Sequence, residues 1–363
     1  MSPQITILGA GAMGSAFATP ATRAGLAVSL WGTHLDTGIV AQLRDGRPHP
    51  RTGEALPAGV RVFDHADLGQ ALADSSLVAC AIASDGVRDV MASAATALAA
   101  AAAATGATPG HPRAVLIMSK GFAVSPSGRV ELLTDTVART LADHGVESPV
   151  VAVGGPCKAN EVAAGTPTAA VFAATDPALA GQLAAEIASD DYGIEAGGDP
   201  AGVEVAAALK NVFAIALGIC DGLAARLGRP RHDLRAAVFA EAVAEIATVV
   251  EMCGGRAGTA HGLAGVGDLE VTGLSGRNRA YGELIGSGLA PTAAFDRMAA
   301  DGLTVEGHAA APLAVRLIGE RGTAGAKSRV PLLDLLAHGL ELDTFGGDVE
   351  WALARATLPR HRA

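Results

Sequence analysis

The first residues of this chain limit its possible folds more than any other segment. An apolar run, Ile5–Leu8, leads directly into Gly9-Ala10-Gly11-Ala12-Met13-Gly14, and an amphipathic segment begins at Ser15. In this order of strand, turn and helix, Gly9 permits the tight turn, Gly11 lets a pyrophosphate approach the backbone, and Gly14 lets helix and strand pack closely. The segment therefore predicts a parallel α/β sheet that binds a dinucleotide.

The alternation of strand-like and helical segments continues through the first part of the chain. Strands are predicted at residues 27–31, 77–81, 114–118, 150–153 and 169–173, and helices at residues 16–24, 87–104 and 129–141. A polar loop rich in Pro and Gly is expected near residues 46–59. This is the βαβ pattern, so residues 1–199 are predicted to form an NAD(P)-binding Rossmann domain with a mostly parallel sheet.

The pattern changes after Gly197-Gly198-Asp199-Pro200. Apolar residues then recur with a period near 3.6 in the segments 203–217, 234–252, 280–284, 293–298, 309–317 and 330–338. This period is that of amphipathic helices. Residues 200–363 are therefore predicted to form an all-α domain, and a length of 363 residues fits two domains.

Charge and composition exclude several classes of protein. Hydrophobic residues make up 50% of the chain, which excludes intrinsic disorder. The 27 Lys and Arg residues are scattered and outnumbered by 37 Asp and Glu residues, so no basic surface for nucleic acid is indicated. An anionic substrate would need a local basic site.

Cysteine usage and the N-terminal sequence indicate the compartment. The four cysteines are far apart and form no CxxC pair, which argues against a zinc site and against a disulfide framework. No signal peptide is expected, since the sequence after Met1 has no basic region. Val90–Ala107 carries no charge but is mostly alanine, and we expect a soluble helix rather than an integral membrane segment. A cytoplasmic protein is predicted.

The choice between NAD and NADP stays open from the residues alone. After the second predicted strand, an acidic residue would favour the ribose 2′-hydroxyl and an arginine the 2′-phosphate. Neither is present: Thr33 and His34 could serve either cofactor, and Asp36 comes slightly late. Trp31 is expected to pack in the core and could also contact the cofactor.

In the second domain, Lys210-Asn211 interrupts an otherwise apolar helical segment. A buried lysine needs a partner or a task, and its desolvation favours the neutral form that takes part in proton transfer. The alternative is a surface lysine that extends its ammonium group to water. The apolar neighbours on both sides favour the buried position.

Three other segments contain residues suited to catalysis or binding. In the glycine-rich stretch 265–279, Asp268 could hold a lysine ammonium group, and Arg277 with Asn278 could bind a phosphate, whereas Arg279 is read as a solvated charge at a helix start. Lys120 follows a predicted strand, where ligands bind in open α/β sheets. The segment Gly155-Pro156-Cys157 also follows a strand, and Cys157 is expected to line the site rather than act as a nucleophile.

Taken together and in order, these motifs resemble the NAD(P)-dependent glycerol-3-phosphate dehydrogenases. The matching motifs are Gly9–Gly14, Lys120-Gly121, Gly155-Pro156, Glu161-Val162-Ala163, Lys210-Asn211, Gly267-Asp268-Leu269, Thr272, Arg277-Asn278-Arg279 and Glu306-Gly307. The resemblance implies a Rossmann domain followed by a helical domain. It also implies a homodimer that reversibly reduces dihydroxyacetone phosphate to sn-glycerol 3-phosphate with NAD or NADP, for glycerophospholipid synthesis.

The resemblance also implies roles for individual residues. Lys210 is expected to be the catalytic acid and base, with Asp268 and Lys120 as further catalytic residues. The expected substrate-binding residues are Lys120, Gly155, Cys157, Asn211, Asp268, Thr272, Gly276, Arg277 and Asn278. The expected cofactor-binding residues are Gly9, Gly11, Ala12, Met13, Gly14, Trp31, Lys120, Ala159, Arg277 and Glu306. No metal ion is expected.

The chain also departs from the family pattern. A thiol at Cys157 stands where a hydroxyl is usual, Gly276 replaces a serine, and Ala83 stands where a proline is usual. These departures concern the exact substrate and not the class of reaction. Two alternative functions stay open. One is a reductase of the same architecture for another small ketone, such as ketopantoate or an opine-type substrate; the other is a regulatory protein without chemistry. Arg277 argues against the first, and the presence of Lys210 and Asp268 against the second.

Overall fold

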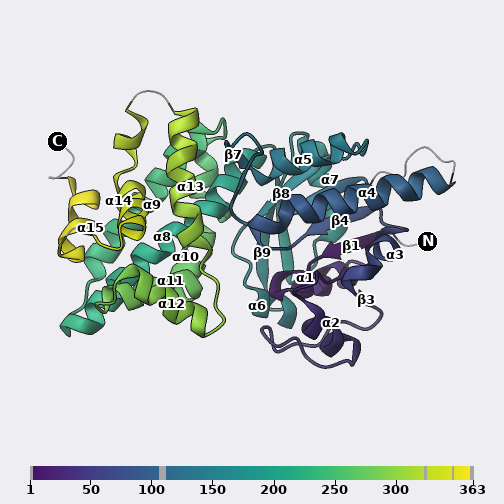
Figure 1. Ribbon diagram of the computed structural model, residues 1–363, viewed down its shortest axis with the longest axis horizontal. Coiled ribbons are helices and arrows are strands. Elements are labelled where there is room, and N and C mark those ends of the chain that lie inside the picture. The colour runs from purple at the N-terminus through teal and green to yellow at the C-terminus, as the bar shows by residue number, and fades with distance from the viewer. Residues whose placement is uncertain (1–2, 106–111, 323–324, 346, 360–363) are drawn as a thin grey trace. The chain divides into compact units, whose positions relative to one another are not determined.

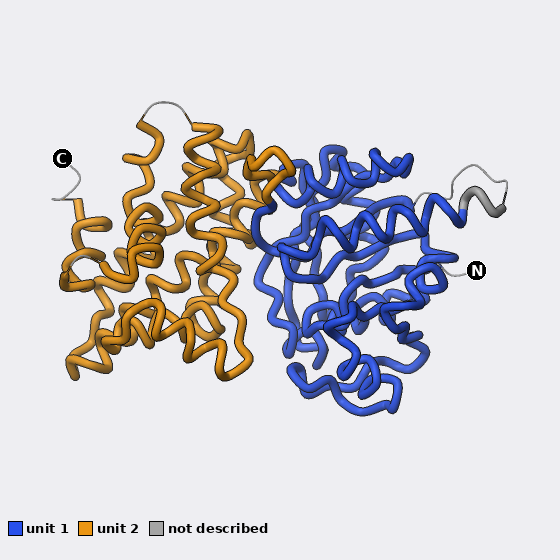
Figure 2. The backbone as a smooth tube through the Cα atoms, in the orientation of Figure 1, with its two compact units in different colours: residues 1–123, 132–200 blue, residues 124–131, 201–363 orange. Residues whose placement is uncertain are grey.

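The computed structural model describes residues 3–105, 112–322, 325–345 and 347–359. The chain divides into two compact units, one formed by residues 1–123 and 132–200 and the other by residues 124–131 and 201–363 (Figure 2). Within the Ala-rich segment Val90–Ala107, residues 106 and 107 lie outside the described residues, as does Met1.

The first unit contains an eight-stranded sheet. Its spatial order is β10 (Tyr192–Gly197), β9 (Thr168–Ala173), β8 (Val150–Gly154), β5 (Ala114–Ile117), β4 (Leu77–Cys80), β1 (Gln4–Leu8), β2 (Ala27–Trp31) and β3 (Arg61–Phe63) (Figure 1). The β8–β9 pair is antiparallel, and the other pairs are parallel. The prediction of a mostly parallel sheet is confirmed.

Both faces of this sheet are covered by helices. Leu77 and Ala79 belong to one apolar core, and Val78 and Cys80 to another, because successive residues of a strand point to opposite faces. The first core includes side chains of α1 (Ala12–Arg23), α2 (Thr37–Arg44), α6 (Ala159–Ala164) and α7 (Pro177–Ile187). The second includes side chains of α3 (Leu68–Leu72), α4 (Val87–Thr105) and α5 (Leu133–Asp143). Figure 1 shows α4 and α5 side by side.

Short elements were missed by the sequence patterns. The helix predicted over 129–141 begins only at Leu133, because β6 (Phe122–Val124) and β7 (Val130–Leu132) form a small hairpin before it. Ser125 closes its turn: its backbone N–H donates to the Arg129 carbonyl, and its hydroxyl oxygen accepts the Arg129 N–H. Strands of three residues are too short for a period of two to be recognised.

The second unit is helical beyond its hairpin segment, as predicted. Its helices are α8 (Pro200–Leu227), α9 (His232–Met252), α10 (Asp268–Leu274), α11 (Arg277–Gly286), α12 (Pro291–Ala300), α13 (Glu306–Arg321), α14 (Pro331–Glu341) and α15 (Val349–Thr357). Helix α8 is long and apolar enough to span a membrane, but its most apolar window is entirely buried inside the protein. It is the central core helix of this unit.

Glycines let α8 and α11 approach each other unusually closely. A Cβ atom added at Gly218 would lie 2.0 Å from the Arg279 carbonyl oxygen, and one added at Gly282 would lie 2.0 Å from the Ile215 carbonyl oxygen. Gly222 and Gly286, one turn further along each helix, show the same arrangement. The backbones of α8 and α11 are therefore in direct contact, which sets the distance between the polar residues that these helices carry.

Candidate active site

The glycine turn after β1 has the geometry that a pyrophosphate requires. Gly9 has φ +109°, and a Cβ atom there would lie 2.8 Å from the Ala81 carbonyl oxygen, while one at Gly14 would lie 2.0 Å from the Gly9 carbonyl oxygen. A Cβ atom at Gly11 would meet nothing within 4 Å. Gly11 is also the N-cap of α1 and gives no side-chain cap. This open turn at a helix N-terminus fits a dinucleotide phosphate.

Ala12 and Met13 form the first residues of α1, beside this turn. Trp31, at the end of β2, is buried, and its Nε1 donates to the His65 carbonyl oxygen at 3.2 Å. The structure thus places Trp31 in the core, and its contact with a cofactor stays a prediction.

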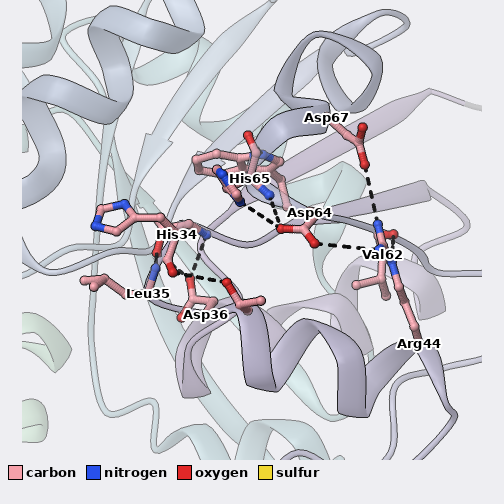
Figure 3. Close-up of polar contacts among 11 residues, drawn as sticks. His34, Leu35, Asp36, Arg44, Val62, Asp64, His65 and Asp67 are labelled. Atoms are coloured by element: carbon pink, nitrogen blue, oxygen red, sulfur yellow. Dashed lines mark hydrogen bonds and ion pairs between the residues drawn. The ribbon is translucent and has the colours of Figure 1, made fainter.

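Backbone and side-chain donors surround the carboxylate of Asp36, which follows β2. Asp36 accepts hydrogen bonds from the backbone N–H and the hydroxyl of Thr33, both at 2.9 Å, and from the Ala10 N–H at 3.4 Å. Figure 3 shows that His34 points away from the neighbouring ion-pair cluster, in which Arg44 faces Asp64 and Asp67. The His34 side chain is exposed, so its contact with either cofactor stays a prediction.

Sequence reasoning missed one residue that supports the turn. His49, in the loop after α2, is 1% exposed, and its Nε2 lies 3.2 Å from the carbonyl oxygen of Ala10. Its Nδ1 accepts the backbone N–H groups of Arg51 and Thr52. The only signal in the sequence is a histidine between two prolines, which is too weak to indicate this contact.

At the carboxyl ends of β5 and β8, the structure brings together two predicted substrate residues. The Lys120 Nζ lies 3.5 Å from the Gly155 carbonyl oxygen, to which it donates. Gly155 has φ +102°, and a Cβ atom there would lie 3.0 Å from the Ala169 carbonyl oxygen. The Cys157 thiol donates to that same Ala169 carbonyl oxygen at 3.1 Å. Ala159 begins α6 beside them.

The second unit contains a buried ion pair at the predicted catalytic lysine. Lys210 is 7% exposed, and its Nζ donates to Asp268 Oδ1 at 2.8 Å and to Thr272 Oγ1 at 2.7 Å. Asp268 is 1% exposed. Asp268 and Thr272 lie one turn apart on α10, so their side chains leave the same face of that helix. The expected buried position of Lys210 is confirmed.

Asn211 joins a second set of predicted residues. It donates to the Glu306 carboxylate at 3.1 Å and accepts from Asn278 Nδ2 at 2.9 Å. Asn278 in turn accepts the Gly307 N–H at 2.9 Å. Gly307 must lack a side chain, because a Cβ atom there would lie 2.3 Å from the Asn211 carbonyl oxygen. The starts of α11 and α13 therefore meet α8 at one point.

Arg277 lies at the edge of this set, after Gly276 with φ +150°. Its guanidinium group donates to the Glu306 carboxylate at 3.0 Å and to the Thr304 hydroxyl. Its side chain is 37% exposed, so it is accessible to an anion. Arg279, by contrast, is not a solvated charge as predicted: its side chain is 25% exposed and pairs with Asp221 and Glu283. The close approach of α8 and α11 places it there.

Comparison with known proteins shows similarity along the whole chain. Residues 4–180 match the family described as NAD-dependent glycerol-3-phosphate dehydrogenase N-terminus, and residues 199–340 match the C-terminus of the same family. The chain is 32% identical over 340 residues to an NADP(+)-dependent glycerol-3-phosphate dehydrogenase of Archaeoglobus fulgidus, covering 93% of this chain and 96% of the relative. It is 35% identical over 321 residues to a glycerol-3-phosphate dehydrogenase [NAD(P)+] of Thiobacillus denitrificans, covering 88% and 89%.

Solved structures show the same similarity. The structure of glycerol-3-phosphate dehydrogenase from Coxiella burnetii has a TM-score of 0.80 and 25% sequence identity, and the match covers 97% of this chain and 98% of that one. The Saccharomyces cerevisiae enzyme, with a TM-score of 0.76 and 20% identity, is similar in fold over 99% of this chain and 100% of its own.

Proposed function

This chain belongs to the NAD-dependent glycerol-3-phosphate dehydrogenase family, and on that premise we propose which of its residues carry out the reaction. The chain is an NAD(P)-dependent oxidoreductase that interconverts dihydroxyacetone phosphate and sn-glycerol 3-phosphate. We assign residues to the proton transfer, to the binding of the substrate phosphate, and to the positioning of these two groups of residues.

Lys210 is proposed to supply and accept the proton. When bound, NAD(P)H supplies a hydride to the ketone carbon of the substrate. The electron pair of the C=O double bond moves to oxygen, and that oxygen takes a proton from the Lys210 ammonium group, which leaves a neutral amine. In the reverse direction, the amine of Lys210 accepts the hydroxyl proton.

One observation carries this assignment: the Lys210 ammonium group is buried and is held by Asp268 and Thr272 at 2.8 and 2.7 Å. The carboxylate balances the charge that burial would otherwise disfavour, and the hydroxyl oxygen limits the directions in which Nζ can point. A positioned ammonium group is what a developing alkoxide requires.

Arg277 and Lys120 are proposed to bind the substrate phosphate. A guanidinium group matches two phosphate oxygens at once, and Arg277 is exposed enough to reach them. Asn278, which is 6% exposed, supports the backbone at this position through Asn211 and Gly307. Lys120 adds a point charge on the first unit.

We also propose a compartment, an oligomeric state and a metabolic role for the enzyme. All four cysteines, Cys80, Cys157, Cys220 and Cys253, carry free thiols, which supports a reducing compartment such as the cytoplasm. The family resemblance supports a homodimer. The product, sn-glycerol 3-phosphate, has the carbon skeleton of glycerophospholipids, which supports a role in their synthesis.

Replacement of Lys210 tests the proposal. We expect Lys210→Met to lower kcat for dihydroxyacetone phosphate reduction by about a thousandfold, because general acid catalysis is lost. Cofactor binding, measured by nicotinamide fluorescence, should be unchanged. Lys327→Met removes an exposed lysine of the same unit and should leave kcat unaltered. A folded Lys210→Met enzyme with near-normal kcat would refute the assignment.

A further inference from the structure

The second unit contains a partly buried carboxylate that the mechanism above does not use. Asp221 lies on α8, about three helical turns after Lys210, so both side chains leave the helix on nearly the same side. Its side chain is 23% exposed. It therefore exerts stronger electrostatic interactions than a fully solvated residue would.

Two arginines from different helices share this carboxylate. The Arg235 Nε, on α9, donates to Asp221 Oδ1 at 3.2 Å, and the Arg279 Nε, on α11, donates to Asp221 Oδ2 at 2.8 Å. Their side chains are 24% and 25% exposed. We refer to Asp221, Arg235 and Arg279 as the Asp221 network.

The Asp221 network reaches both sides of the junction between α10 and α11. A terminal N–H group of Arg235 donates to the Gly273 carbonyl oxygen at 2.8 Å, at the end of α10. Gly273 directly follows Thr272, whose hydroxyl accepts from Lys210. Arg279 lies in the first turn of α11, just after Arg277 and Asn278. Only Ser275 and Gly276 separate the two helices.

We propose that Asp221 is a positioning residue for the substrate. Its carboxylate fixes the side chain of Arg235, which binds the end of α10. It also fixes the side chain of Arg279, which belongs to the first turn of α11. Thr272 is thereby held at the Lys210 ammonium group, and Arg277 is held where the substrate phosphate binds. This inference rests on the proposed function, because it assumes that Arg277 contacts the phosphate.

The sign of the expected effect separates positioning from simple charge. Removing the negative charge of Asp221 makes its surroundings more positive, and long-range attraction alone would then lower the KM for a doubly charged phosphate. Loss of position has the opposite effect: the phosphate contact and the Thr272 contact both weaken, so KM rises and kcat falls. A purely structural residue would change thermal stability without changing either constant.

The test compares Asp221→Asn with Asp221→Glu and with a matched control. Glu350→Gln breaks the Arg231–Glu350 pair, which is also partly buried in the second unit and shares no residue with the Asp221 network. We expect Asp221→Asn to raise the KM for dihydroxyacetone phosphate about tenfold and to lower kcat, with the KM for NAD(P)H unchanged. Asp221→Glu, which keeps the charge, should recover part of both, and Glu350→Gln should leave both unaltered.

An unchanged or lowered KM for dihydroxyacetone phosphate in folded Asp221→Asn protein would overturn the inference. If Asp221→Asn does not fold, the Arg235→Lys variant is used in its place, since a lysine keeps the charge but cannot reach Asp221 and Gly273 together. Arg235→Lys should show the same rise in the KM for dihydroxyacetone phosphate. An unchanged KM in this variant would also overturn the inference. Arg277→Ala distinguishes a failure of the proposed phosphate contact from a failure of the inference about Asp221. If it leaves this KM unchanged, the proposed phosphate contact fails; if it raises KM while Asp221→Asn does not, the inference about Asp221 alone fails.

Discussion

At the scale of single residues, His49 shows how a buried side chain can hold the glycine turn after β1. Since Nδ1 accepts two backbone N–H groups, the ring hydrogen must be on Nε2, where it donates to the Ala10 carbonyl oxygen. The N–H of Ala10 donates to Asp36. Both backbone groups of Ala10 are therefore engaged, and the neutral form of His49 is the one that fits.

This arrangement makes stability depend on pH. Burial, together with the nearby Arg51 charge, lowers the pKa of His49 from its ordinary value of 6.5, although the Ala10 carbonyl and Asp36 act in the opposite direction. Below pH 6.5 the unfolded chain therefore binds a proton at His49 before the folded chain does. The free energy of unfolding should fall as the pH decreases from 6.5 to the folded pKa, by up to about 1.4 kcal/mol per pH unit from this residue.

Chemical denaturation without cofactor at several pH values measures this dependence. His49→Asn should show a weaker decrease of the unfolding free energy below pH 6.5 than the unsubstituted protein. His34→Asn, which removes an exposed imidazole from the same region, is the control and should behave like the unsubstituted protein. Equal slopes for the His49→Asn variant and the unsubstituted protein would contradict the account.

The sequence predicted residue types better than residue partners. The buried position of Lys210 followed from its apolar neighbours, because an isolated cation in an apolar helix needs a partner. The pairing of Arg279 with Asp221 could not be predicted, since Asp221 lies on a helix far away in the sequence. Likewise, nothing local in the sequence indicates that the Cys157 thiol binds the Ala169 carbonyl oxygen.

At the scale of elements, the contact between α8 and α11 depends on four glycines. Gly in a helix normally costs about 1 kcal/mol relative to Ala, so its presence at Gly218, Gly222, Gly282 and Gly286 requires a packing reason. The reason is a backbone oxygen of the facing helix, which would lie only 2.0–2.2 Å from a Cβ atom at each of these positions. A Cβ atom at any of these positions would require one of the two helices to shift as a whole. A shift of α11 would also move Arg277 and Asn278.

Substitution at these glycines tests the contact. Gly282→Ala should lower the free energy of unfolding by about 1–3 kcal/mol, because the added methyl group forces α8 and α11 apart. Gly319→Ala is the matched control: Gly319 lies within α13 and has nothing within 4 Å of the Cβ position, so the same change there should stabilise the protein by about 0.5–1 kcal/mol. Thermal or chemical denaturation measures both, and a neutral Gly282→Ala would show that the helices can separate freely.

Sequence patterns predicted many of the longer elements, but they missed α2, α7 and β10 as well as the short strands β6 and β7. Helix α9 lies close to the predicted segment 234–252, and β2 lies at the predicted residues 27–31, of which the last four are all buried. The hairpin formed by β6 and β7, by contrast, depends on a turn hydrogen bond at Ser125 rather than on a repeated apolar pattern. The glycine contacts of α8 and α11 were equally hidden, because a glycine count does not say which backbone each glycine meets.

At the scale of the whole molecule, the residues with proposed roles are distributed over both units. The first contains the open glycine turn and Lys120, and the second contains Lys210 with the proposed phosphate residues. The change from strands to helices near residue 199 was visible in the sequence. The transfer of residues 124–131 to the second unit was not, because it depends on the Glu320 carboxylate, which accepts the Val130 N–H, and on Arg316, which donates to the Gly128 carbonyl oxygen.

The proposed assignment is a phosphorylated ketone as the substrate, Lys210 as the proton donor and Arg277 as the phosphate anchor. Its most direct test is the rate of NAD(P)H oxidation by the purified protein with dihydroxyacetone phosphate, compared with dihydroxyacetone and ketopantoate. The proposed assignment predicts a kcat/KM for dihydroxyacetone phosphate at least about a hundredfold above that for either phosphate-free ketone, because a ketone without a phosphate loses the charge-assisted hydrogen bonds to Arg277. Equal values for dihydroxyacetone phosphate and a phosphate-free ketone would contradict it.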